Sequence, residues 1–171
     1  MSDIKYVKGT HIVKKQYTPV VNVSGEFDYI DKTDILLGFP LFIKDVYVKE
    51  GNLRIFDENG ELDLNILSDF KGRGNSTWTM PKKPYAIKLS SKAEVMGMPK
   101  HKRWVLLANW LDRTLLRNDI AFEIAKKCPA LPWTPRGEFV ELYLNGKHRG
   151  NYYLCEHIKI DKNRVNIDEI D

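Results

Sequence analysis

The sequence predicts an α+β domain in which one main helix packs on a mostly antiparallel sheet. Short runs of alternating or β-branched residues recur along the chain, and glycine, proline or asparagine separates them. Two of these runs, residues 138–144 and 147–155, are joined by Asn145-Gly146, which is typical of a two-residue β-hairpin. Residues 113–127 form the one long segment with apolar residues at helical spacing.

Taken in chain order, predicted strands and turns precede the helix, and the hairpin follows it. The predicted strands are residues 18–23, 41–49, 53–56, 62–67, 85–89, 104–108, 138–144 and 147–155. Residues 26–40 are irregular, and residues 50–52 and 58–60 have the composition of turns. In the strand at residues 85–89, alternation places Tyr85, Ile87 and Leu89 on one face and Ala86 and Lys88 on the other.

The helix has recognisable ends and one apolar face. Asp112 is a good N-cap, and Pro129 ends the helix just after Cys128. Leu116, Ile120 and Ile124 recur at helical spacing. We therefore expect these three side chains to be buried against the sheet.

The composition indicates a globular domain and excludes several classes. Of the 171 residues, 43% are hydrophobic and 29% are charged, which is not the composition of a disordered chain. No apolar run approaches the roughly 18 residues of a membrane span. The two cysteines and four histidines lack the spacing of metal ligands, so no transition-metal site is expected.

Positive charge is concentrated in residues 70–103. Between Lys71 and Arg103 there are nine lysine or arginine residues and one acid, Glu94, although the formal net charge of the whole chain is only +4. These charges are interleaved with glycine and small hydroxyl residues. Glycines allow close backbone approach, and clustered N–H groups with lysine and arginine form sites for phosphate oxygens. A solvated basic face is the alternative interpretation of the charges alone.

Five runs of sequence occur in a recognisable order after residue 70: GRGNSTW (72–78), KKPYAIKL (82–89), GMPKHKRWVLLANWLDRTLLRN (97–118), TPRGEFVELYLNGKHRGNYYLCEHIK (134–159) and KNRVNI (162–167). With these runs the chain resembles the CotH family, the spore-coat-protein-H-like kinases, over about residues 70–167. The resemblance implies a fold resembling the small lobe of an atypical protein-kinase-like fold. It also implies transfer of phosphate from ATP to serine or threonine of protein substrates, with spore coat proteins as the known substrate class.

The resemblance further implies that catalytic parts lie outside this chain. In the family, the catalytic and metal-holding aspartates lie C-terminal to the matched region, and no counterpart occurs here. We therefore expect N-terminal strands in residues 1–65 and a kinase-like N-terminal lobe in residues 66–171. The Mg²⁺ ligands would lie elsewhere, and the chain alone would not phosphorylate a substrate. ATP and a protein substrate are the expected partners, nucleic acid is not, and the family suggests a spore-associated, cell-surface or extracytoplasmic location.

Lys88 and Glu123 are the first pair of predicted nucleotide-binding residues. Phosphoryl transfer depends on cations positioned against the phosphates. Tyr85-Ala86-Ile87-Lys88 is similar to the strand motif of kinases, so Lys88 is expected at the α- and β-phosphates, with Glu123 of the following helix holding it. The alternatives are an exposed strand lysine and a solvated helix glutamate.

The other predicted nucleotide-binding residues lie in the basic loop and after the hairpin. Arg73, Asn75 and Ser76 are expected near the β- and γ-phosphates, with Arg73 as a bidentate donor. Lys83 adds charge, although it and its neighbour Lys82 point in opposite directions in an extended segment. Glu156 follows the hairpin, where kinase-like folds meet the adenine. Its side chain is expected either to bind ribose or to anchor the lobe interface.

Some features leave other functions open. A non-catalytic module that recognises an acidic protein, a polyanion or an anionic surface would have the same clustered charge. A surface or adhesion protein is a third alternative.

Arg117 and Asn118 are interpreted as structural helix residues. The four tryptophans are interpreted as core or lobe-interface aromatics.

Overall fold

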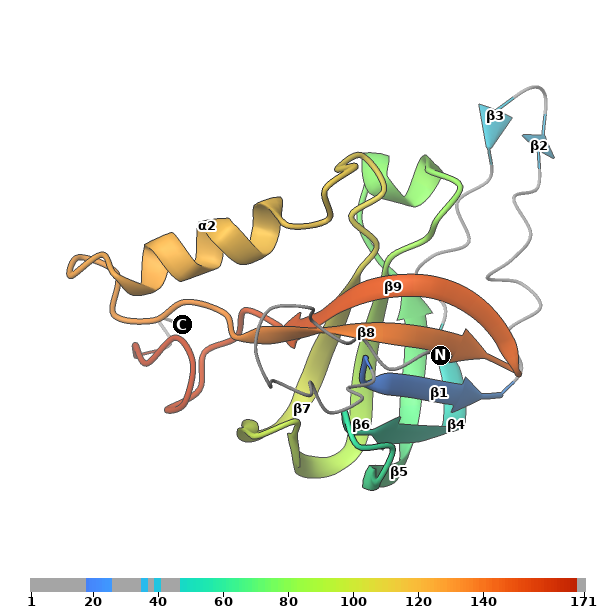
Figure 1. Cartoon of the computed structure of the whole chain (residues 1–171), viewed down its shortest axis with the longest axis horizontal. Coiled ribbons are helices and arrows are strands. Elements are labelled where there is room, and N and C mark those ends of the chain that lie inside the picture. Colours follow the sequence, from blue (N-terminus) through green and yellow to red (C-terminus); the bar gives the residue numbers. More distant parts are fainter. Residues whose placement is uncertain (1–17, 26–34, 37–38, 41–46, 169–171) are drawn as a thin grey trace, which may run out of the picture.

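Seven strands form a closed barrel in this computed structural model, which describes residues 18–25, 35–36, 39–40 and 47–168. Around the barrel, the strands follow the order β1-β4-β5-β6-β7-β9-β8 (Figure 1). They are β1 (Val20–Ser24), β4 (Val48–Phe56), β5 (Leu62–Gly72), β6 (Tyr85–Val95), β7 (Met98–Leu107), β8 (Gly137–Leu144) and β9 (Lys147–Glu156). The other elements are β2 (Ile35–Leu36), β3 (Phe39–Pro40), the 3₁₀ helix η1 (Ser76–Thr79) and the helix α2 (Arg117–Lys126).

The predicted fold class, an α+β domain resembling a kinase small lobe with a packed helix, is wrong. The described residues are mostly strand, and the sheet closes because β1 pairs antiparallel with β4 and parallel with β8. In the parallel pairing Val20 lies opposite Glu141, far away in the sequence. Local residue patterns do not specify which distant strands pair, so they did not predict the closure.

Apolar side chains fill the barrel interior. Tyr85, Ile87 and Leu89 of β6 all belong to the buried core, which confirms the face predicted from alternation. The other strands contribute buried residues that include Val21, Leu53, Ile55, Phe70, Trp104, Leu106, Val140, Leu142, Tyr152 and Leu154. A smaller cluster of Val105, Tyr153 and Cys155 lies apart from this core, with Phe122 and Phe139 packed against it.

Several strand boundaries differ from the prediction. β6 continues to Val95 and β7 begins at Met98, so both strands are longer than predicted. β4 runs through the turn expected at residues 50–52, because a register shift after Val48 and the positive φ of Glu50 make a β-bulge there. The strand predicted at residues 41–49 lies largely outside the described residues.

The hairpin between β8 and β9 is as predicted. Asn145 and Gly146 have φ values of 47° and 75°, which is the backbone that a two-residue type I′ turn requires. The β4–β5 turn also falls where the sequence placed it, with the Gly60 N–H donating to the carbonyl of Asp57 at 3.0 Å.

α2 begins at Arg117, four residues later than predicted. The carboxylate of Asp112 accepts bonds from the backbone N–H groups of Thr114 (3.0 Å) and Arg117 (2.9 Å). Leu115 has a φ of 63°, which is incompatible with a right-handed helix. Asp112 therefore stabilises a turn that precedes the helix.

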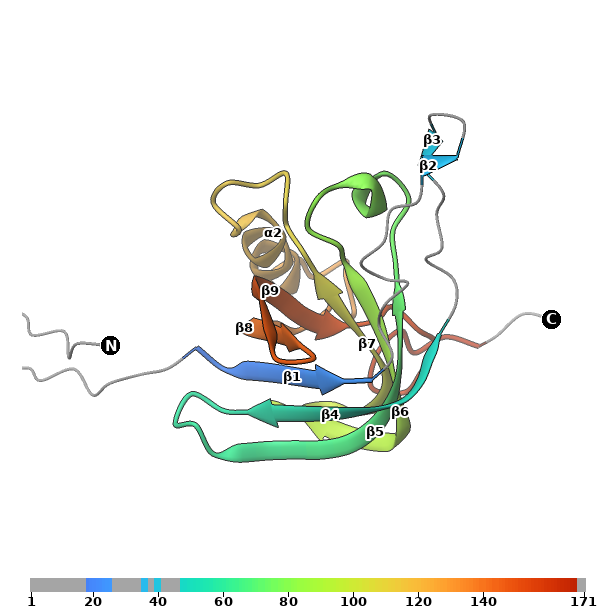
Figure 2. The ribbon, with the colours of Figure 1, turned by 90° about the vertical axis from the view of Figure 1, so that its right-hand side faces the viewer.

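The helix face predicted to be buried is exposed. Leu116, Ile120 and Ile124 are 44%, 51% and 66% exposed, and no residue of α2 is fully buried. A different face contacts the barrel, where Phe122 lies 6.2 Å from the ring of Tyr153 and Asp119 accepts a bond from the Tyr153 hydroxyl. Figure 2 shows α2 beside β9. Within the described ranges, no helix is long and apolar enough to cross a membrane.

Phe122→Ala should lower the free energy of unfolding by about 2 kcal/mol, because it removes the aromatic contact between α2 and the barrel. Ile124→Ala is the matched control and should change stability by less than about 0.5 kcal/mol, because this side chain is exposed. Urea unfolding of both variants measures the difference. A larger loss in Ile124→Ala would contradict the observed orientation of the helix.

Candidate functional site

The loop between β5 and β6 is shaped by its own packing. A Cβ on Gly72 would lie 2.4 Å from the ring of Trp78, and one on Gly74 would lie 2.0 Å from Thr77 Oγ1. η1 folds back so that Trp78 is buried against Gly72 and meets Tyr85 edge-on, with 6.4 Å between ring centroids. Both glycines are therefore required by the loop itself.

This loop faces residues 107–118 across a cavity of about 270 Å³, which we call the loop cavity. Both segments lie at the same end of the barrel in Figures 1 and 2. The lining residues are Arg73, Thr77, Met80, Lys82, Pro84, Leu107, Ala108, Asn109, Trp110, Leu111, Asp112, Arg117 and Asn118.

The loop cavity carries an excess of positive charge. Arg73, Lys82 and Arg117 line it, and among its described lining residues Asp112 alone has a carboxylate. Backbone hydrogen bonding from Arg117 is the main cause that lowers the pKa of Asp112, so this carboxyl is ionised at neutral pH. Burial lowers the pKa of the Lys82 ammonium, which donates to the Asn151 carbonyl.

One wall of the loop cavity is held by an amide pair. Asn109 has a φ of 48°, and its Nδ2 donates to the carbonyl of Leu115 at 3.0 Å. Its Oδ1 accepts a bond from Asn118 Nδ2 at 2.7 Å. These bonds connect the end of β7 to the start of α2 and hold Trp110 and Leu111 between them.

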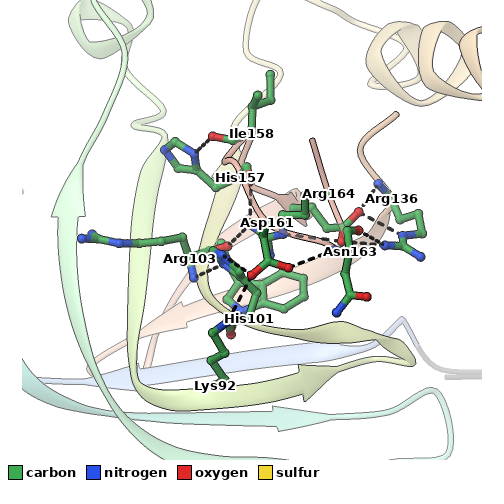
Figure 3. A network of polar contacts seen from close by, with 11 residues as sticks. Lys92, His101, Arg103, Arg136, His157, Ile158, Asp161, Asn163 and Arg164 are labelled. Atoms are coloured by element: carbon green, nitrogen blue, oxygen red, sulfur yellow. Dashed lines mark hydrogen bonds and ion pairs between the residues drawn. The ribbon is translucent and has the colours of Figure 1, made fainter. Parts of the chain in front are cut away.

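A buried ionic cluster lies after β9. Glu156 has a fully buried side chain whose oxygens accept bonds from the backbone N, Nε and Nη2 of Arg136 at 3.0, 3.0 and 2.9 Å. Arg164 Nε is 3.7 Å from the same carboxylate, and this guanidinium lies 5.0 Å from the ring of Trp104. Arg164 Nη1 also donates to the carbonyls of Arg103 (2.8 Å) and His157 (2.6 Å). Figure 3 shows how Arg136 and Arg164 converge here.

A second polar contact holds residues 157–168 against the β6–β7 hairpin. Asp161 lies 3.1 Å from the Lys92 ammonium and 4.0 Å from His101 Nε2 (Figure 3). His101 Nδ1 accepts a bond from the backbone N–H of Arg103 at 2.9 Å, which requires this nitrogen to be unprotonated. Burial, and next the charge of Arg164, lower the pKa of His101.

The model of one protein family matches this chain. It describes the CotH kinase protein and covers residues 70–171, more than half of the sequence. The chain belongs to the CotH kinase family. A search of curated proteins found no match. The matched region contains both walls of the loop cavity and the ionic cluster around Glu156.

The loop residues predicted from the CotH resemblance are only partly brought together. Arg73 lines the loop cavity. Asn75 and Ser76 are exposed at the start of η1 and are not among its lining residues; their carbonyls accept bonds from the Trp78 N–H (3.1 Å) and the Thr79 hydroxyl (2.6 Å).

The two neighbouring lysines of the loop point to different places. Lys83 donates to the carbonyl of Trp78 at 2.8 Å, and burial lowers the pKa of its ammonium. Lys82, and not Lys83, lines the loop cavity. Lys83 was the predicted nucleotide-binding residue of the two, and alternation allowed only one of them to face a given ligand.

The structure does not bring Lys88 and Glu123 together. Lys88 Nζ lies 3.9 Å from Asp69 on β5, whereas the half-exposed Glu123 pairs with Lys126 on its own helix. The separation follows from α2, which is attached to β9 through Asp119 rather than lying over β6.

Glu156 has the contacts of an anchor. Arg136 and Arg164 occupy its carboxylate, which leaves no exposed oxygen for a ribose hydroxyl. Of the two roles expected for the Glu156 side chain, these contacts fit an anchor better than a ribose ligand. Its role in a CotH kinase stays a prediction.

Several lining residues of the loop cavity were not among the predicted nucleotide-binding residues. Lys82, Asn109, Arg117 and Asn118 all lie within the runs that resemble CotH kinases, and that position was the available signal. Arg117 and Asn118 were interpreted as structural because a helix starting at residue 113 would have contained them.

The described lining residues of the loop cavity do not form a complete Mg²⁺ site. Mg²⁺ prefers several oxygen ligands, and the oxygens of Asp112 already accept bonds from Thr114 and Arg117. In the part of the chain that the structure describes, no group of three His, Cys, Asp or Glu side chains is arranged to hold a metal.

Glu156→Gln should lower the free energy of unfolding by about 3–5 kcal/mol, because it leaves the buried Arg164 and the partly exposed Arg136 without their carboxylate. Glu123→Gln, the matched control on the exposed helix, should change stability by less than about 0.5 kcal/mol. Urea unfolding measures both. Equal effects would show that the ionic cluster does not stabilise the fold.

Acidification below about pH 6.5 should destabilise the protein through His101. Its pKa is lowered in the folded state, so the unfolded state binds more protons as the pH falls from the usual His value to the folded one. His157, whose pKa burial also lowers, acts in the same direction. The urea midpoint should therefore fall between about pH 7.5 and about pH 5.5. His101→Gln should reduce this decrease, and an unchanged pH dependence in that variant would exclude His101 as a cause.

Proposed function

We propose that this chain supplies the nucleotide-phosphate-binding part of a CotH-type kinase that transfers phosphate from ATP to serine or threonine of a protein substrate. The loop cavity is the observation that carries the proposal. Three of the runs that resemble CotH kinases meet there, and they contribute Arg73, Lys82 and Arg117 to its lining. Membership of the CotH kinase family supports the proposed reaction class, and the cavity supports the proposed site.

The charges of the loop cavity suit a triphosphate. The guanidinium of Arg73 can donate two parallel bonds to phosphate oxygens. The partly buried Lys82 ammonium lies where electrostatic attraction is stronger than in water, and a bound anion would offset the desolvation that lowers its pKa. Asp112 Oδ1 lies 3.5 Å from Arg117 Nε, so its charge offsets that of Arg117 rather than those of Arg73 and Lys82.

The remaining parts of the reaction are assigned on the family resemblance. Positioned cations are the main requirement of phosphoryl transfer, but a base for the substrate hydroxyl and ligands for Mg²⁺ are also needed. We propose that residues outside this chain supply both. A spore-associated or cell-surface substrate is proposed on the same ground.

A second candidate function is binding of a polyanion or an acidic protein without catalysis. One observation favours it: four cations gather on the outer surface around Tyr47, which we call the Tyr47 cluster. Arg103 Nη1 donates to the Tyr47 hydroxyl at 2.6 Å, and the ammonium groups of Lys49 and Lys71 lie 5.2 and 5.1 Å from its ring. Lys88 joins the cluster through Asp69, which also pairs with Lys49.

Calorimetric titration with ATP, with and without Mg²⁺, tests the kinase proposal. Arg73→Gln and Lys82→Gln should each weaken ATP binding by about 10- to 100-fold, because each removes a charge-assisted contact to phosphate. Lys100→Gln is the matched control, an exposed lysine of β7 that does not line the cavity, and it should leave binding unchanged.

The same experiment separates the two candidates. Absence of ATP binding, together with salt-sensitive binding of polyphosphate that Lys71→Gln and Arg103→Gln weaken, would replace the kinase proposal with the second one. Circular dichroism of each variant checks that the barrel is still folded, since Lys82 also bonds to the backbone of β9.

A further inference from the structure

Trp110 is a large aromatic side chain that the fold leaves half exposed. It is 50% exposed, whereas Trp78 and Trp104 are 5% and 1% exposed. Trp110 and Lys82 both line the loop cavity and a neighbouring cavity bounded by Lys83 and His148. Packing of the barrel core therefore does not explain Trp110, which lies between two cavities beside the partly buried ammonium group of Lys82.

The backbone around Trp110 is held in place. The Asp112 N–H donates to the Asn109 carbonyl at 3.0 Å, which closes a tight turn around Trp110 and Leu111. The bonds of Asn109 to Leu115 and Asn118 fix the same turn. A ligand that stacks on the indole ring would meet a preorganised surface and would need little ordering of the chain.

The loop cavity combines an apolar part with a cationic part. Met80, Pro84, Leu107 and Leu111 join Trp110 in the apolar part, and Arg73, Lys82 and Arg117 form the cationic part. A ligand with a planar ring and an attached chain of phosphates has the matching chemistry. The volume of about 270 Å³ lies just below the usual range of ligand pockets, so the cavity would enclose part of such a ligand.

We infer that Trp110 is the stacking platform for the base of the bound nucleotide, with the phosphates directed toward Arg73 and Lys82. This inference rests on the proposed nucleotide-binding function and adds the orientation of the nucleotide. The amides of Asn109 and Asn118 are bonded to each other and to Leu115, so recognition of the base depends on its ring face. Stacking on an aromatic side chain stabilises a bound base whichever base it is.

Comparison of ATP with inorganic tripolyphosphate separates base recognition from phosphate recognition. By calorimetry on the full chain, Trp110→Leu should weaken ATP binding by about 5- to 100-fold and leave tripolyphosphate binding within about twofold. Trp110→Phe, which keeps an aromatic face, should retain most of the ATP affinity. Ile124→Ala, an exposed apolar residue of α2 that does not line the cavity, is the control and should change neither ligand.

Tryptophan fluorescence gives a second readout. ATP should quench the emission of the wild-type chain, tripolyphosphate should not, and Trp110→Phe should lose the quenching while it still binds ATP by calorimetry. Circular dichroism checks the fold of each variant.

The outcomes distinguish this inference from the proposed function. ATP binding that Arg73→Gln weakens and Trp110→Leu does not would overturn the inference and leave the proposed function standing. Equal weakening of both ligands by Trp110→Leu would show a structural role for the side chain and would also overturn it. A wild-type chain that binds neither ATP nor tripolyphosphate would overturn both.

Discussion

The pairing of β1 with both β4 and β8 closes the barrel, and the position of the other elements depends on it. Without β1, two strands would present unpaired backbone groups at opposite edges of the sheet. Closure holds the β8–β9 hairpin against the early strands. Through Tyr153, β9 in turn attaches α2, and through the contact of Glu156 with Arg164 it attaches residues 157–168. The position of the proposed site therefore depends partly on β1, a strand that lies outside the region matched by the family model.

Two groups of cations in the region matched by the family model differ in what they contact. Arg136 and Arg164 are committed to the buried carboxylate of Glu156 and stabilise the region after β9. Arg73 and Lys82 instead line a cavity whose single carboxylate is bonded to its own turn. The first group is expected to matter for folding, and the second for recognition of an anion. Net charge alone does not separate these two groups.

The candidate site was predictable as a region but not in its residue contacts. The basic loop and Arg73 followed from charge, glycine content and resemblance to CotH kinases. Which of Lys82 and Lys83 faces the cavity depended on how the loop folds around Trp78. The expected pairing of Lys88 with Glu123 assumed a helix packed over β6. Instead, α2 contacts the barrel through Asp119, and Lys88 finds Asp69 on the adjacent strand.

The sequence by itself determined the features that depend on near neighbours. Asn145-Gly146 specifies its turn because both residues accept a positive φ, and alternation specifies the inward face of β6. The ordered runs after residue 70 were enough to indicate the CotH family. Only the tertiary structure decided the closure of the barrel and the face by which α2 attaches to it. Both depend on contacts between segments far apart in the chain, and burial against a distant surface is not encoded in local periodicity.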